Sequence, residues 1–465
     1  MRIAHINHGD SARLTGGTAV VTLALHEALR RLGIDSNVWC RWLDTRTPGV
    51  SGLPVPRWSQ GVDALLRPLG RAVGLNDVHA VSAFLLPRAP AFRRSDLLHL
   101  HCLHEGYLSL LALPRLTAEK PTVYTMHDTW AFTGHCAVID GCERWRTGCG
   151  NCPALDAPPV VQRDSTRVEW RLKRRAYERA ELTLVCPSRW MVDVVSRSMM
   201  SRHPVHHVPH GVDIQRLRPL DRARCRAALG IPESRPVLMF VGSGSRYKGG
   251  DLLAAALQRL SPALRRELML LVMGDGDDGV TRGLGLDVRR LGQVVDPETK
   301  SLAYSAADLF LFPTRGESFG LVALESLACG TPVVSFRVGG VPDHVRHGTT
   351  GLLAEPGDAA GFADAVLALL EDPARREAMG RAARCMVADE YTIELEAKRY
   401  LSIYRQVLGI EAAPIPEPSQ PEVSTPQPQS SAQSPPSTPL TPVGAAGVSA
   451  SPAGAAEPEL AGETQ

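Results

Sequence analysis

Short apolar runs alternate with longer amphipathic segments over the first two hundred residues of the chain. The run at residues 2–7 predicts a strand, and Val20, Leu23, Leu25 and Leu29 recur at the spacing of a helix over residues 18–32. Further strand-sized apolar runs lie at residues 38–40, 97–101, 122–125 and 182–187. Strands that alternate with helices in this way predict a doubly wound parallel sheet.

The pattern restarts at Pro236, after a polar connection over residues 210–235. Strand-sized apolar runs follow at residues 237–242, 268–273, 288–291, 309–312, 332–336 and 351–354. The expected fold class is therefore α/β, with two Rossmann-like doubly wound domains over residues 1–205 and 206–410 that face a central cleft. We expect the last helix to pack back on the N-terminal domain. Ligands of such sheets bind outside the carboxyl ends of the strands, which places the chemistry in the cleft.

Residues 411–465 contain no Lys, Arg or aromatic residue and hold 12 of the 36 prolines. A segment of this composition cannot form a core, so it is expected to be a disordered tail. Its six Glu leave the remaining body with a net charge of about +8, although the whole chain carries only +2. This charge suits an anionic substrate or an anionic membrane surface, and it equally fits ordinary solvated Arg side chains on helices.

Composition and length exclude several classes of protein. With 44% apolar and 22% charged residues, the chain buries a sizeable core, and its small net charge argues against a nucleic-acid partner. No apolar run approaches the roughly 20 residues that span a bilayer. The N-terminus lacks the cationic and apolar regions of a signal peptide, so we expect a cytoplasmic protein.

The most informative stretch surrounds Glu317 and Glu325. After the predicted strand at residues 309–312, Ser318 is an expected N-cap for a helix over residues 319–329. The free N–H groups at Phe319 and Gly320 would then face the cleft and bind a phosphate group. A carboxylate is repelled by phosphate, so Glu317 is better suited to sugar hydroxyls and Glu325 to a ribose. Two ordinary helix-surface acids are the alternative.

Glu317 and Glu325, in the frame Pro-Thr-x-x-Glu-Ser-Phe-Gly-Leu-x-x-x-Glu, resemble the signature of the retaining glycosyltransferases of family 4. Shorter stretches agree with this resemblance: Thr15-Gly-Gly17, His210-Gly-Val-Asp213, Ala307-Asp308 and Gly339-Gly-Val-Pro342. The resemblance covers about residues 1–408 and excludes the tail. It implies a nucleotide-diphosphate sugar held mainly by the C-terminal domain, transfer with retention of configuration, and no metal cofactor for the chemistry.

The resemblance also implies roles for residues on the donor side. Lys248 matches the family's lysine on the diphosphate, a cation that neutralises the leaving group. Where the family usually has an Arg, this chain has Ser243, and Arg246 is close enough in sequence to substitute. Gly16 and Gly17 resemble a loop whose backbone approaches the diphosphate or the acceptor. Solvated turn residues are the alternative for each of these positions.

His127, in Tyr124-Thr-Met-His-Asp128, resembles the family's histidine near the reacting sugar. Its imidazole can bind a sugar hydroxyl without acting as a general base. A purely structural histidine is the alternative. His99 and His101 flank a predicted strand end and fit a structural role better. Asp275 and Asp277 form an Asp-x-Asp pattern that binds metal in another glycosyltransferase fold, but here turn chemistry accounts for it.

Four of the ten cysteines, Cys136, Cys142, Cys149 and Cys152, fall within 17 residues. The Cys149-Gly-Asn-Cys152 pair is typical of zinc knuckles, and four thiolates would close a tetrahedral structural site. Disulfides or free thiols are the alternative. A subset of bacterial family members, some in polysaccharide assembly, is similar in this loop.

We therefore expect a retaining hexosyltransferase that uses a nucleotide-sugar donor and a glycan or lipid-linked glycan acceptor, in bacterial surface or exopolysaccharide biosynthesis. Peripheral association with the inner face of the membrane would accompany a lipid-linked acceptor. Two alternatives stay open: a glycogen- or sucrose-synthase-like enzyme with a soluble acceptor, and an inactive nucleotide-sugar-binding scaffold, for which Ser243 is the argument.

Overall fold

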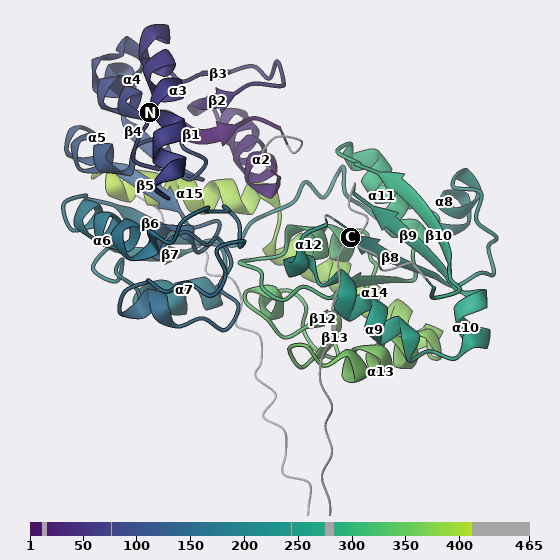
Figure 1. Ribbon diagram of the computed structural model, residues 1–465. Coiled ribbons are helices and arrows are strands. Elements are labelled where there is room, and N and C mark those ends of the chain that lie inside the picture. Colours follow the sequence, from purple (N-terminus) through teal and green to yellow (C-terminus); the bar gives the residue numbers. More distant parts are fainter. Residues whose placement is uncertain (12–15, 76, 243, 275–282, 412–465) are drawn as a thin grey trace, which may run out of the picture. The chain divides into compact units, whose positions relative to one another are not determined.

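The computed structural model describes residues 1–11, 16–75, 77–242, 244–274 and 283–411. Within these residues the chain forms two parallel β-sheets, each covered by helices (Figure 1). Three features of the sequence lie outside the described residues: Ser243, the Asp-x-Asp pattern at Asp275 and Asp277, and the tail from residue 412.

The first sheet has seven strands in the order β3-β2-β1-β4-β5-β6-β7. Its strands are β1 (Arg2–Gly9), β2 (Asp35–Trp42), β3 (Val50–Gly52), β4 (Leu97–Leu100), β5 (Thr122–Thr125), β6 (Thr183–Cys186) and β7 (Val205–His207). All neighbouring strands pair in parallel. The strand order reverses between β1 and β4, as in a doubly wound Rossmann-like fold.

The second sheet repeats this plan with six strands in the order β10-β9-β8-β11-β12-β13. Its strands are β8 (Val237–Val241), β9 (Met269–Met273), β10 (Asp287–Gly292), β11 (Leu309–Phe312), β12 (Val333–Phe336) and β13 (Gly351–Ala354). Every residue of β9 is buried, which explains its uninterrupted apolar sequence: a parallel sheet with helices on both faces has no solvent-facing side. The expected fold class is confirmed.

The helices precede, connect and follow these strands. The α-helices are α2 (Gly17–Arg31), α3 (Arg57–Ala72), α4 (Pro90–Arg94), α5 (Leu113–Glu119), α6 (Thr166–Tyr177), α7 (Arg189–Ser196), α8 (Arg222–Ala228), α9 (Gly250–Gln258), α10 (Pro262–Glu267), α11 (Pro297–Ala306), α12 (Leu321–Ala328), α13 (Ala359–Leu370), α14 (Pro373–Glu390) and α15 (Ile393–Val407). Short 3-10 helices add η1 (Val81–Arg88), η2 (Leu110–Ala112), η3 (Trp130–Phe132), η4 (Arg144–Arg146), η5 (Arg246–Lys248) and η6 (Val341–Asp343). No helix among the described residues is long and apolar enough to cross a membrane.

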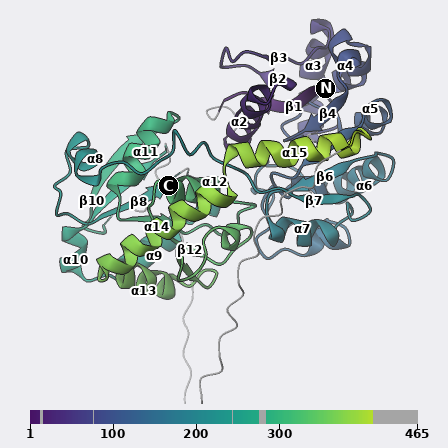
Figure 2. The same ribbon diagram turned by 180° about the vertical axis from the view of Figure 1, so that it is seen from behind.

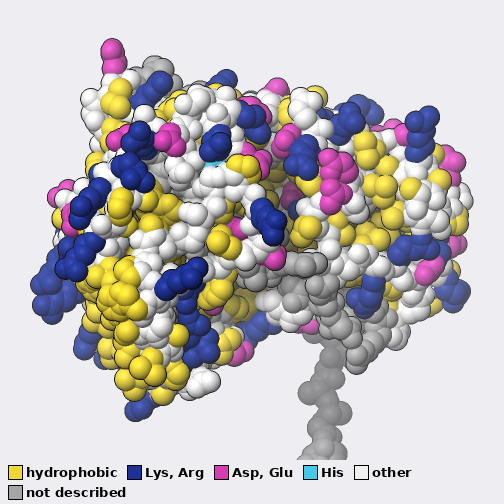
Figure 3. Space-filling view, turned by 90° about the horizontal axis from the view of Figure 1, so that it is seen from above, with side chains coloured by type: hydrophobic (Ala, Val, Ile, Leu, Met, Phe, Trp, Pro, Cys, Tyr) yellow, Lys and Arg dark blue, Asp and Glu magenta, His cyan; other side chains and the backbone are white. Residues whose placement is uncertain are grey.

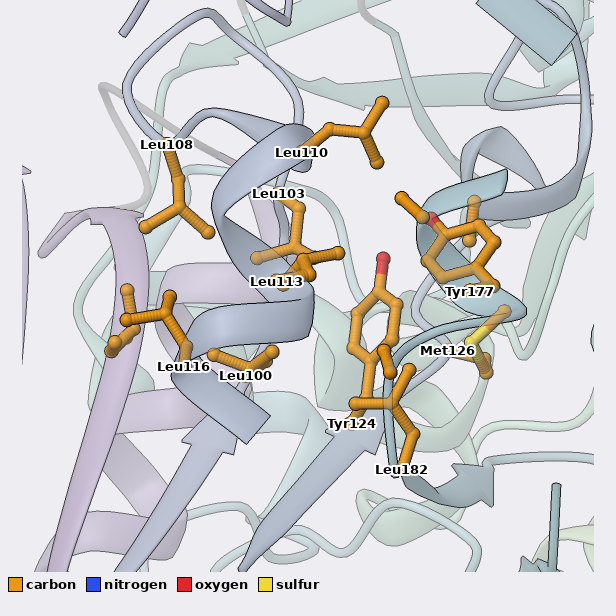
Figure 4. Close-up of a cluster of buried hydrophobic side chains, with 14 of the residues drawn as sticks. Leu100, Leu103, Leu108, Leu110, Leu113, Leu116, Tyr124, Met126, Tyr177 and Leu182 are labelled. Atoms are coloured by element: carbon orange, nitrogen blue, oxygen red, sulfur yellow. The ribbon is translucent and has the colours of Figure 1, made fainter. Parts of the chain in front are cut away.

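Large apolar side chains fill the layer between the first sheet and its helices. Leu100 on β4 and Tyr124 on β5 pack with Leu113 and Leu116 of α5 and with Tyr177 at the end of α6 (Figure 4). All five are almost completely buried. The strands that lead into the cleft loops are therefore closely packed against helices, and this packing fixes the positions at which the loops begin.

The last helix of the body, α15, packs against the first sheet, although α14 before it packs with the second half (Figure 2). Tyr400 OH lies 2.7 Å from Thr125 Oγ1 on β5, and Tyr404 OH lies 2.7 Å from His99 Nδ1 on β4. The chain crosses between the halves twice, side by side, through a parallel bridge between Val212 and Thr392. Hydrogen bonds between buried polar groups thus hold α15 against the first sheet, and the bridge joins the two crossing segments.

Candidate active site

A cavity of about 490 Å³ is lined by loops that follow strands of both sheets. From the first sheet it receives Gly16 and Gly17 after β1, His104 after β4, and His127 and Asp128 after β5; from the second it receives Glu317, Phe319 and Gly320 after β11. β1 and β4 flank the reversal of strand order in the first sheet, and β8 and β11 flank it in the second. Loops diverge at such points, so a binding site forms there.

Gly16 and Gly17 begin α2 at the wall of this cavity. Gly16 has a positive φ of +64°, and a Cβ on either glycine would meet no described atom within 4 Å. The backbone of both glycines is thus open toward the cavity.

Lys248 reaches the site through a tight turn after β8. Its Nζ donates a hydrogen bond to Glu317 Oε2 at 3.0 Å, and both side chains remain partly exposed. Gly249 permits this approach, because it has φ +70° and a Cβ there would lie 1.9 Å from the Pro313 carbonyl oxygen. Gly339 does the same for Glu317: a Cβ would lie 1.8 Å from its carbonyl oxygen. Gly249 and Gly339 therefore permit the close backbone approaches that bring Lys248 and Glu317 within hydrogen-bond distance.

The helix after Glu317 begins later than the sequence predicts. α12 starts at Leu321 and its cap is Gly320, with φ +96°, instead of Ser318. The prediction of Ser318 as N-cap is therefore wrong. The carbonyl of Ser318 accepts a hydrogen bond from Ser188 Oγ at 2.6 Å, so this residue ties the loop to the first half of the chain. The left-handed turn that ends this loop requires glycine, and a Cβ at Gly320 would press on Phe312.

Arg246 does not line this cavity. Its guanidinium lies 3.7 Å from Asp140 and 3.8 Å from Asp156, two acids of the Cys-rich loop region. Arg246 thus forms ion pairs with acids other than Glu317, and Lys248 is the cation that contacts Glu317.

Glu325 lies in a second cavity, of about 260 Å³, which shares Val21 and Leu321 with the first. It is 2% exposed, and its carboxylate accepts hydrogen bonds from Lys300 Nζ at 2.6 Å and from Tyr304 OH at 3.1 Å. Both donors belong to α11. Sequence reasoning missed them, because nothing at their positions differs from an ordinary amphipathic helix.

His127 ends a chain of hydrogen-bonded histidines. His5 Nδ1 lies 3.0 Å from His101 Nε2, and His101 Nδ1 lies 2.9 Å from His127 Nε2. Burial lowers the pKa of His5 and of His127 to about 3, and it lowers the pKa of His101 well below its ordinary value. All three rings are therefore neutral near pH 7, and each carries one N–H.

His5, at the buried end of this series of histidines, determines which ring nitrogen of each histidine is protonated. His5 Nε2 is buried and has no partner among the described residues. An orphaned N–H is rarer in proteins than an orphaned acceptor, so His5 carries its proton on Nδ1 and donates to His101. His101 then donates from Nδ1 to His127 Nε2, and His127 carries its proton on Nδ1. This tautomer makes His127 a hydrogen-bond donor toward a ligand.

The ring of His127 also stacks on His210, with ring centroids 5.2 Å apart and an interplanar angle of 17°. His210 Nδ1 donates to Glu396 Oε1 at 3.0 Å, and the backbone N–H of Gly211 donates to Glu396 Oε2 at 2.8 Å. A Cβ on Gly211 would lie 2.4 Å from the Thr392 carbonyl oxygen. The His-Gly-Val-Asp motif therefore marks the domain crossing and carries a ring of the cavity wall.

Asp128 pairs with His104 across the cavity wall, with His104 Nε2 2.9 Å from Asp128 Oδ2. Burial alone would lower the pKa of His104, but Cys102 and the Asp128 carboxylate raise it well above its ordinary value. His104 also lowers the pKa of Asp128 against the opposing effect of burial. The sequence analysis left the role of Asp128 open and did not single out His104.

Cys136, Cys142, Cys149 and Cys152 are unpaired and line one small cavity. The backbone N–H of Gly134 donates to Cys149 Sγ at 3.2 Å, and His135 Nε2 lies 3.4 Å from Cys152 Sγ. Among the described residues, the sets whose ligand atoms all lie within 4.8 Å are His5 with His99 and His101, and Cys102 with His104 and Asp128. The four sulfurs thus gather around one space and would have to close further around a tetrahedral ion.

Two family models match the chain, one described as "Glycosyltransferase Family 4" over residues 15–216 and one as "Glycosyl transferases group 1" over residues 235–372. A D-inositol 3-phosphate glycosyltransferase of Kribbella flavida is 33% identical over 86% of this chain and 92% of its own length. D-inositol 3-phosphate glycosyltransferase 1 of Catenulispora acidiphila is 39% identical over 44% of this chain and 52% of its own length, so that match spans about half of the relative.

Solved structures share the arrangement of the two sheets. Sucrose-phosphate synthase from Thermosynechococcus elongatus has a TM-score of 0.63 at 22% identity over 88% of this chain and 99% of its own. WaaG, a glycosyltransferase involved in lipopolysaccharide biosynthesis, has 0.60 at 19% over 86% and 99%. HepE of Anabaena, in complex with UDP and glucose, has 0.60 at 17% over 87% and 99%. At these identities the likeness is one of fold.

Proposed function

Since the chain belongs to glycosyltransferase family 4, we propose that it transfers a hexose-type sugar, with retention of configuration, from a nucleoside-diphosphate sugar to a glycan or lipid-linked glycan acceptor. The setting we propose is bacterial surface or exopolysaccharide biosynthesis. The observation that carries the proposal is the 490 Å³ cavity, whose lining brings Glu317 and His127 together from opposite sheets.

The chemistry of the cavity suits a neutral, hydroxyl-rich ligand. Its described lining includes the carboxylates of Glu105, Asp128 and Glu317 and has no Lys or Arg among them. Carboxylates accept hydrogen bonds from sugar hydroxyls, and His127 donates one from Nδ1. We assign the transferred sugar to this cavity, with Glu317 and His127 in contact with its hydroxyl groups.

The diphosphate would lie between Lys248, the N-terminus of α12 and the backbone of Gly16 and Gly17. A family 4 transfer needs leaving-group charge to be neutralised by protein groups, and a cation together with a helix end supplies this. The nucleoside would extend into the 260 Å³ cavity, where Glu325 accepts from the ribose hydroxyls. A carboxylate has about four lone-pair sites, so Glu325 can do this while it keeps Lys300 and Tyr304.

A soluble phosphorylated acceptor is the second candidate, because the curated relatives are named D-inositol 3-phosphate glycosyltransferases. The carboxylates of Glu105 and Asp128 would repel the phosphate group of an acceptor placed beside them in the large cavity. Two further alternatives are an enzyme with a glycogen- or sucrose-synthase-like acceptor and an inactive scaffold. The donor and acceptor assay described next distinguishes both from our proposal.

The test is a panel of UDP-, GDP- and ADP-sugars, read first as a shift in the unfolding temperature and then as donor turnover. A ligand at about 100 times its Kd adds about 2.7 kcal/mol of stability, enough for a shift of a few degrees. One nucleotide should give a selective shift and turnover with a glycan acceptor, and Glu317→Gln should abolish turnover. A shift in unfolding temperature without turnover on any acceptor would support the inactive nucleotide-sugar-binding scaffold. Turnover only with inositol phosphate as the acceptor would establish the second candidate.

A structural zinc ion in the Cys-rich loop is a separate proposal. Four thiols around one small cavity are the donor set that zinc takes in structural sites. The N–H of Gly134 that donates to Cys149 Sγ would stabilise the thiolate form of that ligand. The ion would be held by Cys136, Cys142, Cys149 and Cys152 and would stabilise the loop that carries Trp145.

A further inference from the structure

Helix α3 exposes its apolar side chains. Trp58, Leu65 and Leu69 are 67%, 78% and 64% exposed, and Val62 is exposed as well. The intervals of four, three and four residues place them on one stripe of the helix. The other exposed residues of this kind in the described part of the chain come from separate elements, apart from Val73 directly after α3, and form no second stripe.

The face that α3 turns inward is polar and small. It carries Ser59, Asp63 and Gly70. Asp63 Oδ1 accepts from the backbone N–H of Ser82 at 3.0 Å, and Asp63 Oδ2 accepts from its hydroxyl. A Cβ on Gly70 would lie 2.8 Å from the Leu75 carbonyl oxygen. These contacts lock the rotation of α3, so the apolar stripe cannot turn into the core. An ordinary surface helix turns its apolar side chains to the core and its polar side chains to water, which is the reverse of what α3 shows.

The surroundings of α3 are basic. Residues 41–94 hold eight Arg against three Asp, and Asp63 and Asp77 are both buried. Arg67 and Arg71 line a cavity of about 310 Å³ on the flank of the helix. Arg67 Nε is buried, and no described residue accepts its hydrogen bond. Two guanidinium groups at one cavity, one of them with a free Nε–H, can bind a phosphate group.

We propose that α3 is a membrane-docking helix, which lies in the interface of an anionic bilayer with Trp58, Leu65 and Leu69 among the acyl chains and Arg67 and Arg71 on lipid phosphates. An interfacial helix combines an apolar stripe that includes Trp with flanking basic residues. Figure 3 looks down on the side of the molecule to which α3 belongs and shows hydrophobic side chains gathered there with Lys and Arg side chains beside them.

A second copy of the chain fits this surface less well. A stable dimer buries roughly 800 Å² on each partner, more than one helical stripe offers. A two-fold contact would also bring Arg57, Arg67 and Arg71 of both copies together, and like charges repel. A bilayer has no such limit of area, and its anionic lipids attract the same arginines.

Glu105 lines both the 310 Å³ cavity and the 490 Å³ cavity. A lipid phosphate held by Arg67 and Arg71 would therefore sit next to the space assigned to the sugar. This consequence, that an acceptor arrives from the bilayer, rests on the proposed function. The docking itself does not, because it is measured without donor or acceptor.

The experiment is co-sedimentation of the full chain with phosphatidylcholine vesicles, with and without phosphatidylglycerol. We expect binding to the phosphatidylglycerol vesicles and a fall of about tenfold or more in the partition coefficient for Leu65→Ser/Leu69→Ser. Arg67→Gln/Arg71→Gln should reduce binding to the anionic vesicles and leave the weak binding to phosphatidylcholine unchanged. The matched control is Val168→Ser, which changes an exposed aliphatic residue on α6 and should bind as the unchanged chain does.

Unchanged thermal midpoints would show that these surface variants fold. The proposal is overturned if the chain stays in the supernatant with anionic vesicles, or if Leu65→Ser/Leu69→Ser sediments as the unchanged chain does. It is also overturned if analytical ultracentrifugation finds a dimer that this double variant dissociates, because the stripe would then join two copies. Donor turnover with no vesicle binding would retain the proposed function and reject the docking helix.

Discussion

Lys248 Nζ lies 3.0 Å from Glu317 Oε2, so the cation assigned to the diphosphate and the carboxylate assigned to the sugar contact each other. The two side chains are 34% and 22% exposed. An ion pair of this exposure contributes little to stability, so Lys248 can exchange Glu317 for a phosphate oxygen at small cost. The ion pair holds Lys248 and Glu317 near the positions proposed for binding the diphosphate and the sugar until the donor replaces their contact with each other.

Lys248→Met should lower kcat by about 10²- to 10³-fold, because it removes a charge aimed at the leaving group. Its unfolding temperature should change little, since the pair is partly exposed. Arg246→Met is the matched control: Arg246 lies against Asp140 and Asp156, so its loss should leave kcat within a few-fold. Steady-state kinetics with the donor that the nucleotide-sugar panel selects measures both. Equal losses in the two variants would contradict the assignment of Lys248.

Glu325→Ala should destabilise the protein before any question of donor binding arises. Lys300, whose side chain is only 14% exposed, is left without its carboxylate, and breaking a pair with one fully buried partner costs up to about 3–5 kcal/mol. The double variant Lys300→Met/Glu325→Met should recover much of this stability. Urea unfolding of both variants gives the comparison. If Glu325→Ala unfolds at the same urea concentration as the unchanged chain, Lys300 has another partner and the pair is not structural.

Nitrogen-15 spectra of histidine-labelled protein test the hydrogen-bond chain from His5 to His127. We expect His127 to be protonated on Nδ1 and to present an unprotonated Nε2, which accepts from His101. Replacing the donor by His101→Phe should release this preference and mix the two tautomers of His127. A native spectrum with His127 protonated on Nε2 would show that the chain of donors runs the other way.

Acid should destabilise the native state over a wide range of pH. His5, His127 and His344 have pKa values of about 3 in the folded protein, because they are buried. Below pH about 6.5 the unfolded chain binds protons at these residues and the native state does not, so stability falls with decreasing pH. The expected slope is about 1.4 kcal/mol per pH unit for each of them. Urea unfolding between pH 7 and pH 5 measures it, and a His344→Leu variant that folds should have a shallower slope.

Purified chain from cells grown with zinc should contain about one zinc ion per molecule, measured by mass spectrometry of the metal. Cys149→Ser should lose it, because each thiolate of a closed tetrahedral site is required. Chelation should lower the unfolding temperature and leave the donor-induced shift in place, because the proposed zinc ion is structural and lies in the Cys-rich loop. Cys225→Ser, a buried cysteine outside the loop, should retain the zinc. Metal-free protein with four reactive thiols would refute a zinc site.

The fold followed from the sequence because parallel strands buried on both faces must be continuously apolar. β5, β11 and β13 lie at the residues predicted for them, and the repeated pattern gave two sheets of Rossmann-like order. The short strands β3 and β7 were not predicted, since three residues carry no periodicity of their own. β7 also extends the first sheet to His207, beyond the boundary expected at residue 205.

The site was predictable where a residue type is tied to a turn. Glu317, Lys248 and His127 follow strand ends, and adjacent glycines mark the close approaches that hold the loops. The partners of these groups were not predictable. Glu396, which holds His210, lies 186 residues away in sequence, and only the return of α15 to the first sheet brings the two together. Local pattern carries no information about such a contact.

The return of α15 has a consequence for how the chain is made. Strands β4 and β5 carry His99 and Thr125, whose hydrogen-bond partners Tyr404 and Tyr400 are among the last residues of the body to be synthesised. While the ribosome translates the second half, the first half therefore waits with an uncovered apolar surface around Ile3, Leu97 and Val123. A nascent chain stalled before residue 393 is thus a natural client of the chaperones that shield exposed sheets, and the first domain acquires its native stability only after translation of the second is complete.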